Sequence, residues 1–208
     1  MNALTQRLTL QGGQGTLETL VDQPGKSVPA RGVALIAHPH PLHGGTMDNK
    51  VVQTVARAFV QCGWQAVRFN FRGVGASAGT YDEGRGELAD LLAVLAQMAP
   101  EGPVALAGFS FGAFVTSHAV AALWPQRSIE RLVLIGTATS RFQVANVPAD
   151  LHERTLVVHG EHDDTVPLAA VMDWARPQVL PVTVVPAGGH FFHGQLPLLK
   201  SLVARHLG

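Results

Sequence analysis

A serine between two glycines is the strongest candidate in the chain for nucleophilic chemistry. Gly108, Ser110 and Gly112 form the pattern G-x-S-x-G. An apolar run typical of a buried parallel strand precedes the pattern, and a run typical of a buried helix follows it. On such a sharp turn a serine hydroxyl projects into a cleft, and the glycines let strand and helix pack closely. We therefore predict that Ser110 is a nucleophile on a strand–turn–helix elbow rather than part of an ordinary glycine-rich turn.

A serine hydroxyl is a weak nucleophile until a base takes its proton, and imidazole is the usual base. The chain has ten histidines. His190 lies in a glycine-rich loop directly after the last predicted strand, which could carry an imidazole back over the sheet. Its place also fits the chain order Ser, Asp, His. We favour His190 as the base. His193 is the nearest alternative, and we expect it to cap or begin the final helix.

The base in turn needs a carboxylate to orient it and to stabilise its charged form. Asp163 and Asp164 both follow the seventh predicted strand. Adjacent side chains point in different directions, so only one of the two can meet His190. The residues alone leave both open.

Two backbone N–H groups are needed to stabilise an oxyanion next to the serine. The N–H of Phe111 is one, because it opens a helix whose N-terminus favours negative charge. The second is expected from the loop at residues 38–45. Pro39 and Pro41 have no N–H, so His40 and Leu42 remain, and we favour His40.

The same loop also suggests a metal site, since His38, His40 and His43 would be enough ligands for zinc. The prolines between them constrain a convergent geometry, and the elbow already accounts for the loop. We therefore predict no metal and no other cofactor.

A glycine-rich segment at residues 70–79 resembles a dinucleotide-binding loop only superficially. Its spacing is G-x-G-x-x-x-G rather than G-x-G-x-x-G, and no helix opens at once. Ser77 in this segment has no elbow around it. We predict neither a dinucleotide site nor a nucleophile here.

Apolar runs alternate with helical patterns along the chain. Leu4 with residues 7–10, and residues 15–21, flank a glycine-rich turn and predict an antiparallel hairpin at a sheet edge. Further strands are predicted at residues 33–37, 65–69, 104–107, 132–135, 156–158 and 182–185. Helices are predicted at residues 48–62, 87–98, 113–124, 168–175 and 196–206. We predict an α/β fold with a mostly parallel sheet of about eight strands, helices on both faces, and a single domain over residues 1–208.

Composition narrows the function classes. Hydrophobic residues make up 47% and charged residues 14%, and 15 basic residues balance 15 acidic ones. No basic run is present, so nucleic acid and anionic membrane are not expected partners. Cys62 is the only cysteine, which excludes an internal disulfide. Residues 1–7 contain no apolar signal core, and no apolar stretch could span a bilayer. We predict a cytoplasmic protein.

Taken together, these features resemble an α/β-hydrolase over nearly the full length of the chain. More narrowly, the chain resembles short bacterial α/β-hydrolases with four ordered motifs. They are H-P-H-P-L-x-G-G-T-M-x-N-K-V-V at residues 38–52, N-F-R-G-V-G-x-S-x-G at 70–79, G-F-S-F-G at 108–112 and a late G-x-H-F-F-H-G that ends at residue 194. Members are described as serine esterases related to dienelactone hydrolases. Dienelactone hydrolases proper have a cysteine nucleophile where this chain has Ser110.

The resemblance implies an α/β-hydrolase fold with a Ser-Asp-His triad, and it chooses between the two acids. The acid loop G-x-x-D-x-x-V-P of α/β-hydrolases matches Gly160, Asp163, Val166 and Pro167 in register. That match picks Asp163, and leaves Asp164 as the expected cap of the helix that begins near Pro167.

The resulting expectation is a serine hydrolase that cleaves a small-molecule carboxylic ester or thioester through an acyl-enzyme. Only residues 137–154 separate the sixth and seventh predicted strands, which is too short for a cap domain, so we predict an open site. Two alternatives are a non-catalytic α/β-hydrolase scaffold and a metal-dependent hydrolase using the His38, His40 and His43 loop. Aromatic residues that are candidates for an apolar acyl pocket are Phe109, Phe111, Phe142, Phe191 and Phe192.

Overall fold

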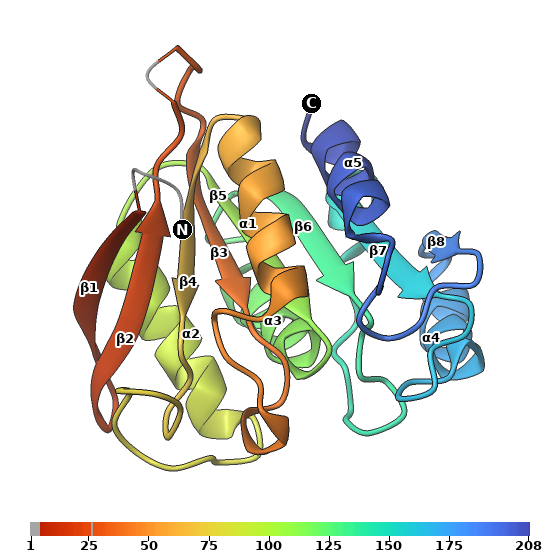
Figure 1. Ribbon diagram of the computed structural model, residues 1–208, viewed down its shortest axis with the longest axis horizontal. Coiled ribbons are helices and arrows are strands. Elements are labelled where there is room, and N and C mark those ends of the chain that lie inside the picture. The colour runs from red at the N-terminus through yellow and green to blue at the C-terminus, as the bar shows by residue number, and fades with distance from the viewer. Residues whose placement is uncertain (1–4, 26) are drawn as a thin grey trace.

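A computed structural model describes residues 5–25 and 27–208 of the chain; Leu4, expected in the first strand, lies outside these residues. In the described residues, eight strands form one sheet with the order β1-β2-β4-β3-β5-β6-β7-β8 (Figure 1). The strands are β1 (Thr5–Gly12), β2 (Gly15–Asp22), β3 (Gly32–Ala37), β4 (Trp64–Phe69), β5 (Val104–Phe109), β6 (Ile129–Ile135), β7 (Thr155–Gly160) and β8 (Val182–Val185).

The pairing of the strands confirms the predicted mixture of a parallel sheet and an antiparallel edge. β1 pairs with β2 and β2 with β4 in antiparallel fashion, while every pair from β4 through β8 is parallel. Every residue of the central strand β5 is buried. Continuous apolar runs are what a sheet covered on both faces requires.

Helices cover both faces of the sheet. They are α1 (Lys50–Gln61), α2 (Arg85–Met98), α3 (Phe111–Leu123), α4 (Leu168–Ala175) and α5 (Leu196–Leu207), with short 3₁₀ turns at Pro41–His43, Ala149–Arg154 and Arg176–Gln178. Buried side chains of α1 and α5 share one core cluster with the sheet, and those of α2, α3 and α4 share the other. In Figure 1, α1 and α5 accordingly lie together in front of the sheet, and α2 and α3 lie behind it. No helix in the described part of the chain is both long and apolar enough to cross a membrane.

The order of the strands explains where a site can form. The chain runs from β3 through α1 to β4 on one side, and then returns through α2 to β5 on the other side of β3. The loops after β3 and β5 therefore diverge, and a crevice opens at the carboxyl ends of these strands. Between β6 and β7 the described chain has only a loop and the 3₁₀ turn at Ala149–Arg154, so no cap domain is inserted there.

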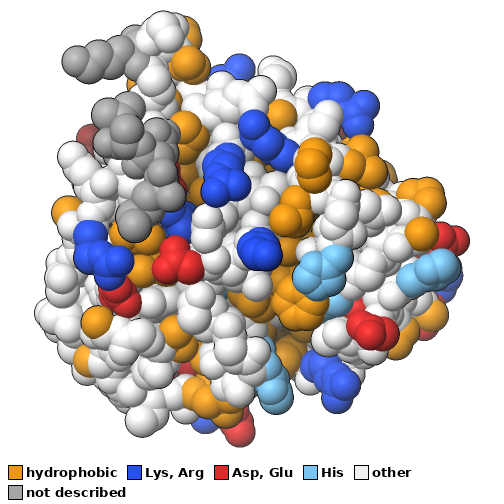
Figure 2. Space-filling model, viewed as in Figure 1, with side chains coloured by type: hydrophobic (Ala, Val, Ile, Leu, Met, Phe, Trp, Pro, Cys, Tyr) orange, Lys and Arg blue, Asp and Glu red, His pale blue; other side chains and the backbone are white. Residues whose placement is uncertain are grey.

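Charge is spread over the surface, as the balanced composition suggests. The face that carries α1 and α5 shows both positive and negative side chains, with hydrophobic side chains between them (Figure 2). The buried charged side chains, in contrast, are bonded within the protein: Arg68 and Arg72 form ion pairs, and Glu87 accepts from backbone N–H groups.

One buried ion pair ties the loop after β4 to α2. Arg72 donates from Nε and Nη2 to the two carboxylate oxygens of Asp90, each at 2.8 Å. The two side chains are only 5% and 1% exposed. Gly86 lies against this guanidinium, and a Cβ at position 86 would overlap the guanidinium atoms, so the close contact requires glycine. The pair therefore fixes the glycine-rich segment at residues 70–79 as a structural loop.

We expect Asp90→Ala to destabilise the protein strongly, because it leaves the Arg72 guanidinium buried and unpaired. Breaking a buried pair in this way costs about 3–5 kcal/mol. The matched control is Asp173→Ala, which removes the exposed partner of Arg176 and should cost less than about 1 kcal/mol. Urea unfolding of both variants measures the difference. Similar losses in the two would contradict the importance assigned to the buried pair.

Candidate active site

Ser110 stands on a strained turn between a strand and a helix, as the sequence predicts. β5 ends at Phe109 and α3 begins at Phe111. Ser110 itself has φ 57° and ψ −115°, a conformation that costs an L-residue energy. Its N–H donates to the carbonyl of Ile135 at 2.8 Å, which holds the turn against β6.

The two glycines around Ser110 are required by close backbone contacts. A Cβ on Gly108 would overlap the backbone of Gly112, and a Cβ on Gly112 would overlap the carbonyl of Ala37 at the end of β3. Any larger residue would push strand, helix and the neighbouring loop apart. The nucleophile candidate is therefore placed by packing that only glycine allows.

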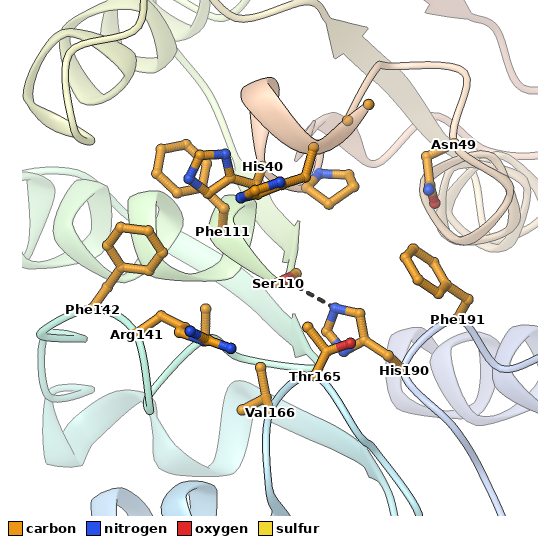
Figure 3. A pocket seen from close by; sticks show the side chains of 15 residues that line it. His40, Asn49, Ser110, Phe111, Arg141, Phe142, Thr165, Val166, His190 and Phe191 are labelled. Carbon is orange, nitrogen blue, oxygen red and sulfur yellow. Dashed lines mark hydrogen bonds between the residues drawn. The ribbon is translucent and has the colours of Figure 1, made fainter.

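The structure brings Ser110, His190 and Asp163 into one hydrogen-bonded chain. His190 Nε2 lies 3.0 Å from Ser110 Oγ, the bond drawn in Figure 3, and His190 Nδ1 lies 2.7 Å from Asp163 Oδ2. A carboxylate can only accept, so Nδ1 carries the proton and Nε2 is left to accept from the serine hydroxyl. All three residues are buried, with relative exposures of 8%, 4% and 7% for Ser110, His190 and Asp163.

Asp163 is held as an ionised carboxylate. Its Oδ1 accepts from the N–H groups of Thr165, at 3.0 Å, and Val166, at 2.7 Å. Burial alone would raise the pKa of Asp163, but the hydrogen bonds with His190 and the Val166 N–H outweigh burial and lower its pKa. Both carboxylate oxygens are thus engaged, one by the backbone of its own loop and the other by the imidazole.

The expectation that Asp164 caps the following helix is wrong. Asp164 is exposed, and its carboxylate accepts from the Thr165 hydroxyl at 3.3 Å. Pro167 occupies the N-cap position of α4, which has no side-chain cap. Asp164 lies three residues before that position, too early to reach the first amides of the helix.

The loop after β3 distinguishes the two candidates for the second oxyanion donor. The N–H of Leu42 donates to the Nδ1 of His40 at 3.2 Å, so it is already occupied. The N–H of His40 donates to no acceptor among the described residues. The His40 ring centroid lies 5.0 Å from that of Phe111, which places this loop beside the start of α3.

The histidines of this loop do not converge as a metal site would require. His38 is fully buried, its Nε2 accepts from the Phe71 N–H at 3.0 Å, and its Nδ1 donates to the Pro39 carbonyl at 2.6 Å. Both nitrogens of His38 are therefore engaged. In the part of the chain that the structure describes, no group of three or more His, Cys, Asp or Glu residues is arranged to hold a metal ion.

Ser77 has a structural place. Its hydroxyl donates to the Asn70 carbonyl at 2.7 Å and accepts from the Glu18 N–H at 2.9 Å. These bonds tie the glycine-rich loop to β2. They engage the Ser77 hydroxyl with backbone groups rather than with a base that could activate it.

A cavity of about 530 Å³ opens in front of Ser110. This volume lies within the range of about 300–1,000 Å³ that is typical of small-molecule sites. Of the five aromatic residues proposed for the acyl pocket, Phe111, Phe142 and Phe191 line the cavity, whereas Phe109 and Phe192 are buried in the core. The remaining lining residues are Pro39, His40, His43, Gly44, Gly45, Asn49, Ser110, Ala138, Arg141, Thr165, Val166 and His190.

Two residues near the site were not found from the sequence. His159, at the end of β7, is fully buried; its Nε2 lies 2.9 Å from the Val166 carbonyl and 3.5 Å from Asp163 Oδ2. Burial lowers its pKa, so this second imidazole stays neutral beside the acid. Its position directly before Gly160 in the acid loop was the available signal. Arg141 reaches the cavity from an irregular loop, and no motif or spacing in the sequence marks it as a site residue.

Comparisons with known proteins agree with the observed fold. A family model described as serine aminopeptidase, S33 matches residues 40–144. XC6422 from Xanthomonas campestris, described as an α/β serine hydrolase without a lid, is 38% identical, with a TM-score of 0.88 over 100% of this chain and 95% of its own. An α/β serine hydrolase homologue from Coxiella burnetii is 37% identical, with a TM-score of 0.84 over 98% of this chain and 97% of its own.

A curated relative, an uncharacterized protein of Rickettsia prowazekii, is 44% identical over 92 residues, which are 42% of this chain and 39% of that protein. The fold and the serine on its elbow define an α/β hydrolase. The chain belongs to the α/β serine hydrolases, in the family that the S33 model describes, and like XC6422 it shows no lid among the residues that the structure describes.

The burial of His38 makes the stability of the fold depend on pH. Burial lowers the pKa of His38 from 6.5 to about 4, although the Pro39 carbonyl acts in the opposite direction. Below pH 6.5 the unfolded chain takes up this proton, while the folded chain does not until about pH 4. The unfolding free energy therefore falls as the pH drops through this window, by up to about 3 kcal/mol from His38.

We expect His38→Gln to reduce this dependence, because its amide can accept from Phe71 but does not titrate. Urea unfolding of both proteins at pH 7 and pH 4.5 measures the change, and the other buried histidines contribute equally to each. The same pH-dependent loss in wild type and variant would contradict the assignment.

Proposed function

We propose that the chain hydrolyses small carboxylic esters through an acyl-enzyme on Ser110. The observation that carries this proposal is the hydrogen-bonded chain from Ser110 through His190 to Asp163 at the elbow. Nucleophile, base and orienting acid are within hydrogen-bond distance before any substrate is bound.

In the proposed mechanism, Ser110 Oγ attacks the ester carbonyl while His190 Nε2 takes its proton. The negative charge that develops on the carbonyl oxygen is stabilised by the N–H groups of Phe111 and His40. His190 then returns the proton to the leaving alcohol as the acyl-enzyme forms. In the second half, His190 takes a proton from water as the water attacks the acyl carbon, and it then returns the proton to Ser110 Oγ as the bond to the acyl group breaks and the carboxylic acid leaves.

Asp163 supports this cycle without exchanging a proton itself. Its bond to Nδ1 keeps the imidazole in the tautomer that leaves Nε2 free to act. The backbone N–H groups of Thr165 and Val166 keep the carboxylate ionised and prevent it from rotating away. It therefore stabilises the imidazolium that forms in each half of the reaction.

The charge of the cavity favours an ester over the substrate of an aminopeptidase. An aminopeptidase must accommodate a terminal ammonium group next to the bond that it cleaves. No Asp or Glu is among the described residues that line the cavity, and Asp163 is already bonded to His190 behind it. An ammonium group would find no counter-charge there, whereas an ester needs none.

We expect Ser110→Ala to stay folded and to lose hydrolysis of p-nitrophenyl esters of graded acyl length by about 10⁴-fold or more. Initial rates, with thermal melting as the check on folding, measure this. The wild-type enzyme should keep its activity in a chelator, and a fluorophosphonate should label Ser110 but not Ser77. Near-normal turnover of the variant would exclude Ser110 as the nucleophile, and loss of wild-type activity in the chelator would favour a metal mechanism.

We expect Asp163→Asn to be far less active than Asp164→Asn. An amide at Asp163 favours the wrong imidazole tautomer, and such a change lowers turnover by about 10⁴-fold in a well-studied triad. Asp164 contacts only Thr165 at the surface, so its amide variant should keep turnover and melting temperature close to wild type. Rates and melting curves of the two variants, collected together, make the comparison. If Asp164→Asn were the inactive one, the acid would have to be reassigned.

A further inference from the structure

Arg141 is a charged side chain in the cavity that the proposed reaction does not use. It follows β6, and its N–H donates to the Ala138 carbonyl, which fixes the backbone of this loop. Figure 3 shows the side chain extending from that loop toward Thr165 and Val166, on the side of the cavity below Ser110. The guanidinium therefore lies in the wall of the cavity that we propose as the substrate site.

The Arg141 guanidinium has no hydrogen bond or ion pair with any described residue. The arginines before and after it in the chain that help to hold the fold are bonded. Arg131 donates to the His206 carbonyl and Arg154 to the Ile129 carbonyl. Arg141 is exposed, it lines this cavity and a neighbouring surface pocket that contains Glu83, and its N–H donors have no protein acceptor among the described residues.

The rest of the cavity wall leaves the Arg141 charge uncompensated. The described lining residues include no carboxylate, although the whole chain has as many acidic as basic residues. Burial and the neighbouring His43 lower the pKa of His40, which keeps that imidazole neutral. The N-terminus of α3, which opens at Phe111, adds partial positive charge on the same side.

Apolar walls next to Arg141 strengthen an interaction with an anion. Phe142 is held in a stack on Phe114, with ring centroids 4.7 Å apart and planes 16° apart. Phe142 and Val166 line the cavity beside the guanidinium. Low-polarity walls reduce the screening of a charge, and a guanidinium matches a carboxylate with two parallel hydrogen bonds.

We propose that Arg141 binds a carboxylate of the substrate, so that the preferred ester is an anion with a free carboxylate close to the scissile bond. This inference rests on the proposed ester hydrolysis. It assigns to Arg141 the selection of the substrate and leaves the chemistry to Ser110, His190 and Asp163.

Two pairs of esters of matched shape test the inference, one for each side of the scissile bond. For the alcohol side they are 3-carboxyphenyl and 3-carbamoylphenyl butanoate; for the acyl side, the monomethyl ester of adipic acid and its terminal amide. Each enzymatic rate is divided by the alkaline hydrolysis rate of the same ester, which removes differences in intrinsic reactivity. In at least one pair we expect wild type to prefer the carboxylate by about 10- to 100-fold in kcat/KM, as for a hydrogen bond to a charged group.

Variants of Arg141 connect the preference to this side chain. Arg141→Gln should bring the ratio within the pair close to one. Arg141→Glu should reverse it, so that 3-(ammoniomethyl)phenyl butanoate is preferred over 3-carboxyphenyl butanoate. The control, Arg176→Gln, changes an exposed arginine that pairs with Asp173 outside the cavity, and it should keep the wild-type ratio. A wild-type ratio near one in both pairs, or an unchanged ratio in Arg141→Gln, would overturn the inference.

The outcome separates this inference from the proposed function. Hydrolysis of neutral esters that depends on Ser110 but shows no preference for the carboxylate would leave the function intact and overturn the inference. If wild type hydrolysed no ester faster than Ser110→Ala, the proposed function would fail. Binding of benzoate and of benzamide, followed by NMR titration, would then decide. Benzoate binding that is lost in Arg141→Gln supports the carboxylate site, and equal binding of both ligands overturns it.

Discussion

The close approach of β5, α3 and the loop after β3 around Ser110 is the constraint on which the rest of the site depends. The backbone at Ser110 is strained, at a cost of about 1–3 kcal/mol, and the surrounding core must hold it there. Phe109 and Phe111, on either side of it, are 1% and 0% exposed, and each packs into a different core cluster. The turn cannot relax without moving one of these rings out of its cluster. The same packing brings the Phe111 N–H beside the serine and the His40 loop against α3, so the proposed nucleophile and the proposed oxyanion donors are held in place by the same contacts.

Asp163 and His190 are held by a second set of contacts, between the loops after β7 and β8. These strands are neighbours in the sheet, and their loops are bonded to each other through the His162 N–H and the Gly188 carbonyl at 2.8 Å. A Cβ on Gly160 would overlap the backbone at Gly188, so the two loops are also in direct contact. His159 holds the loop after β7 in place through a hydrogen bond between its Nε2 and the Val166 carbonyl. The Asp163–His190 bond is thus set by two adjacent loops, while the His190–Ser110 bond spans from them to the centre of the sheet.

The sequence predicts most of the sheet and singles out Ser110, Asp163 and His190, which the structure brings together. The features that the sequence analysis missed or assigned wrongly have physical causes. Buried parallel strands are continuous apolar runs, so all eight were found, but β6 begins at Ile129 rather than Leu132 because Glu130 and Arg131 break the apolar run while the backbone still pairs with β5. The elbow has a fixed spacing, which identifies Ser110. The engagement of the Leu42 N–H by His40 and the misassigned cap at Asp164 depend on loop conformation, which no spacing encodes. Arg141 was missed because it reaches the cavity beside residues that are far away in the chain, and no sequence spacing predicts this proximity.

Because no lid is inserted between β6 and β7, the proposed selection of the substrate has to come from the walls of the cavity, and from Arg141 in particular. A lid excludes water and strengthens every interaction beneath it; in an open site an exposed ion pair contributes only about 0–1 kcal/mol. Arg141 is itself exposed, but Phe142 and Val166 line the same cavity, and apolar walls reduce the screening of a nearby charge. In the proposed mechanism the charge changes at Ser110, His190 and the ester carbonyl, which Arg141 is not proposed to contact, so we expect its attraction for a carboxylate to be similar in the bound substrate and in the transition state. Uniform binding of this kind lowers KM and leaves kcat nearly constant. Under the proposed function, selectivity for the carboxylate would therefore arise in the binding step, while the rate of bond cleavage would depend on the strained elbow at Ser110.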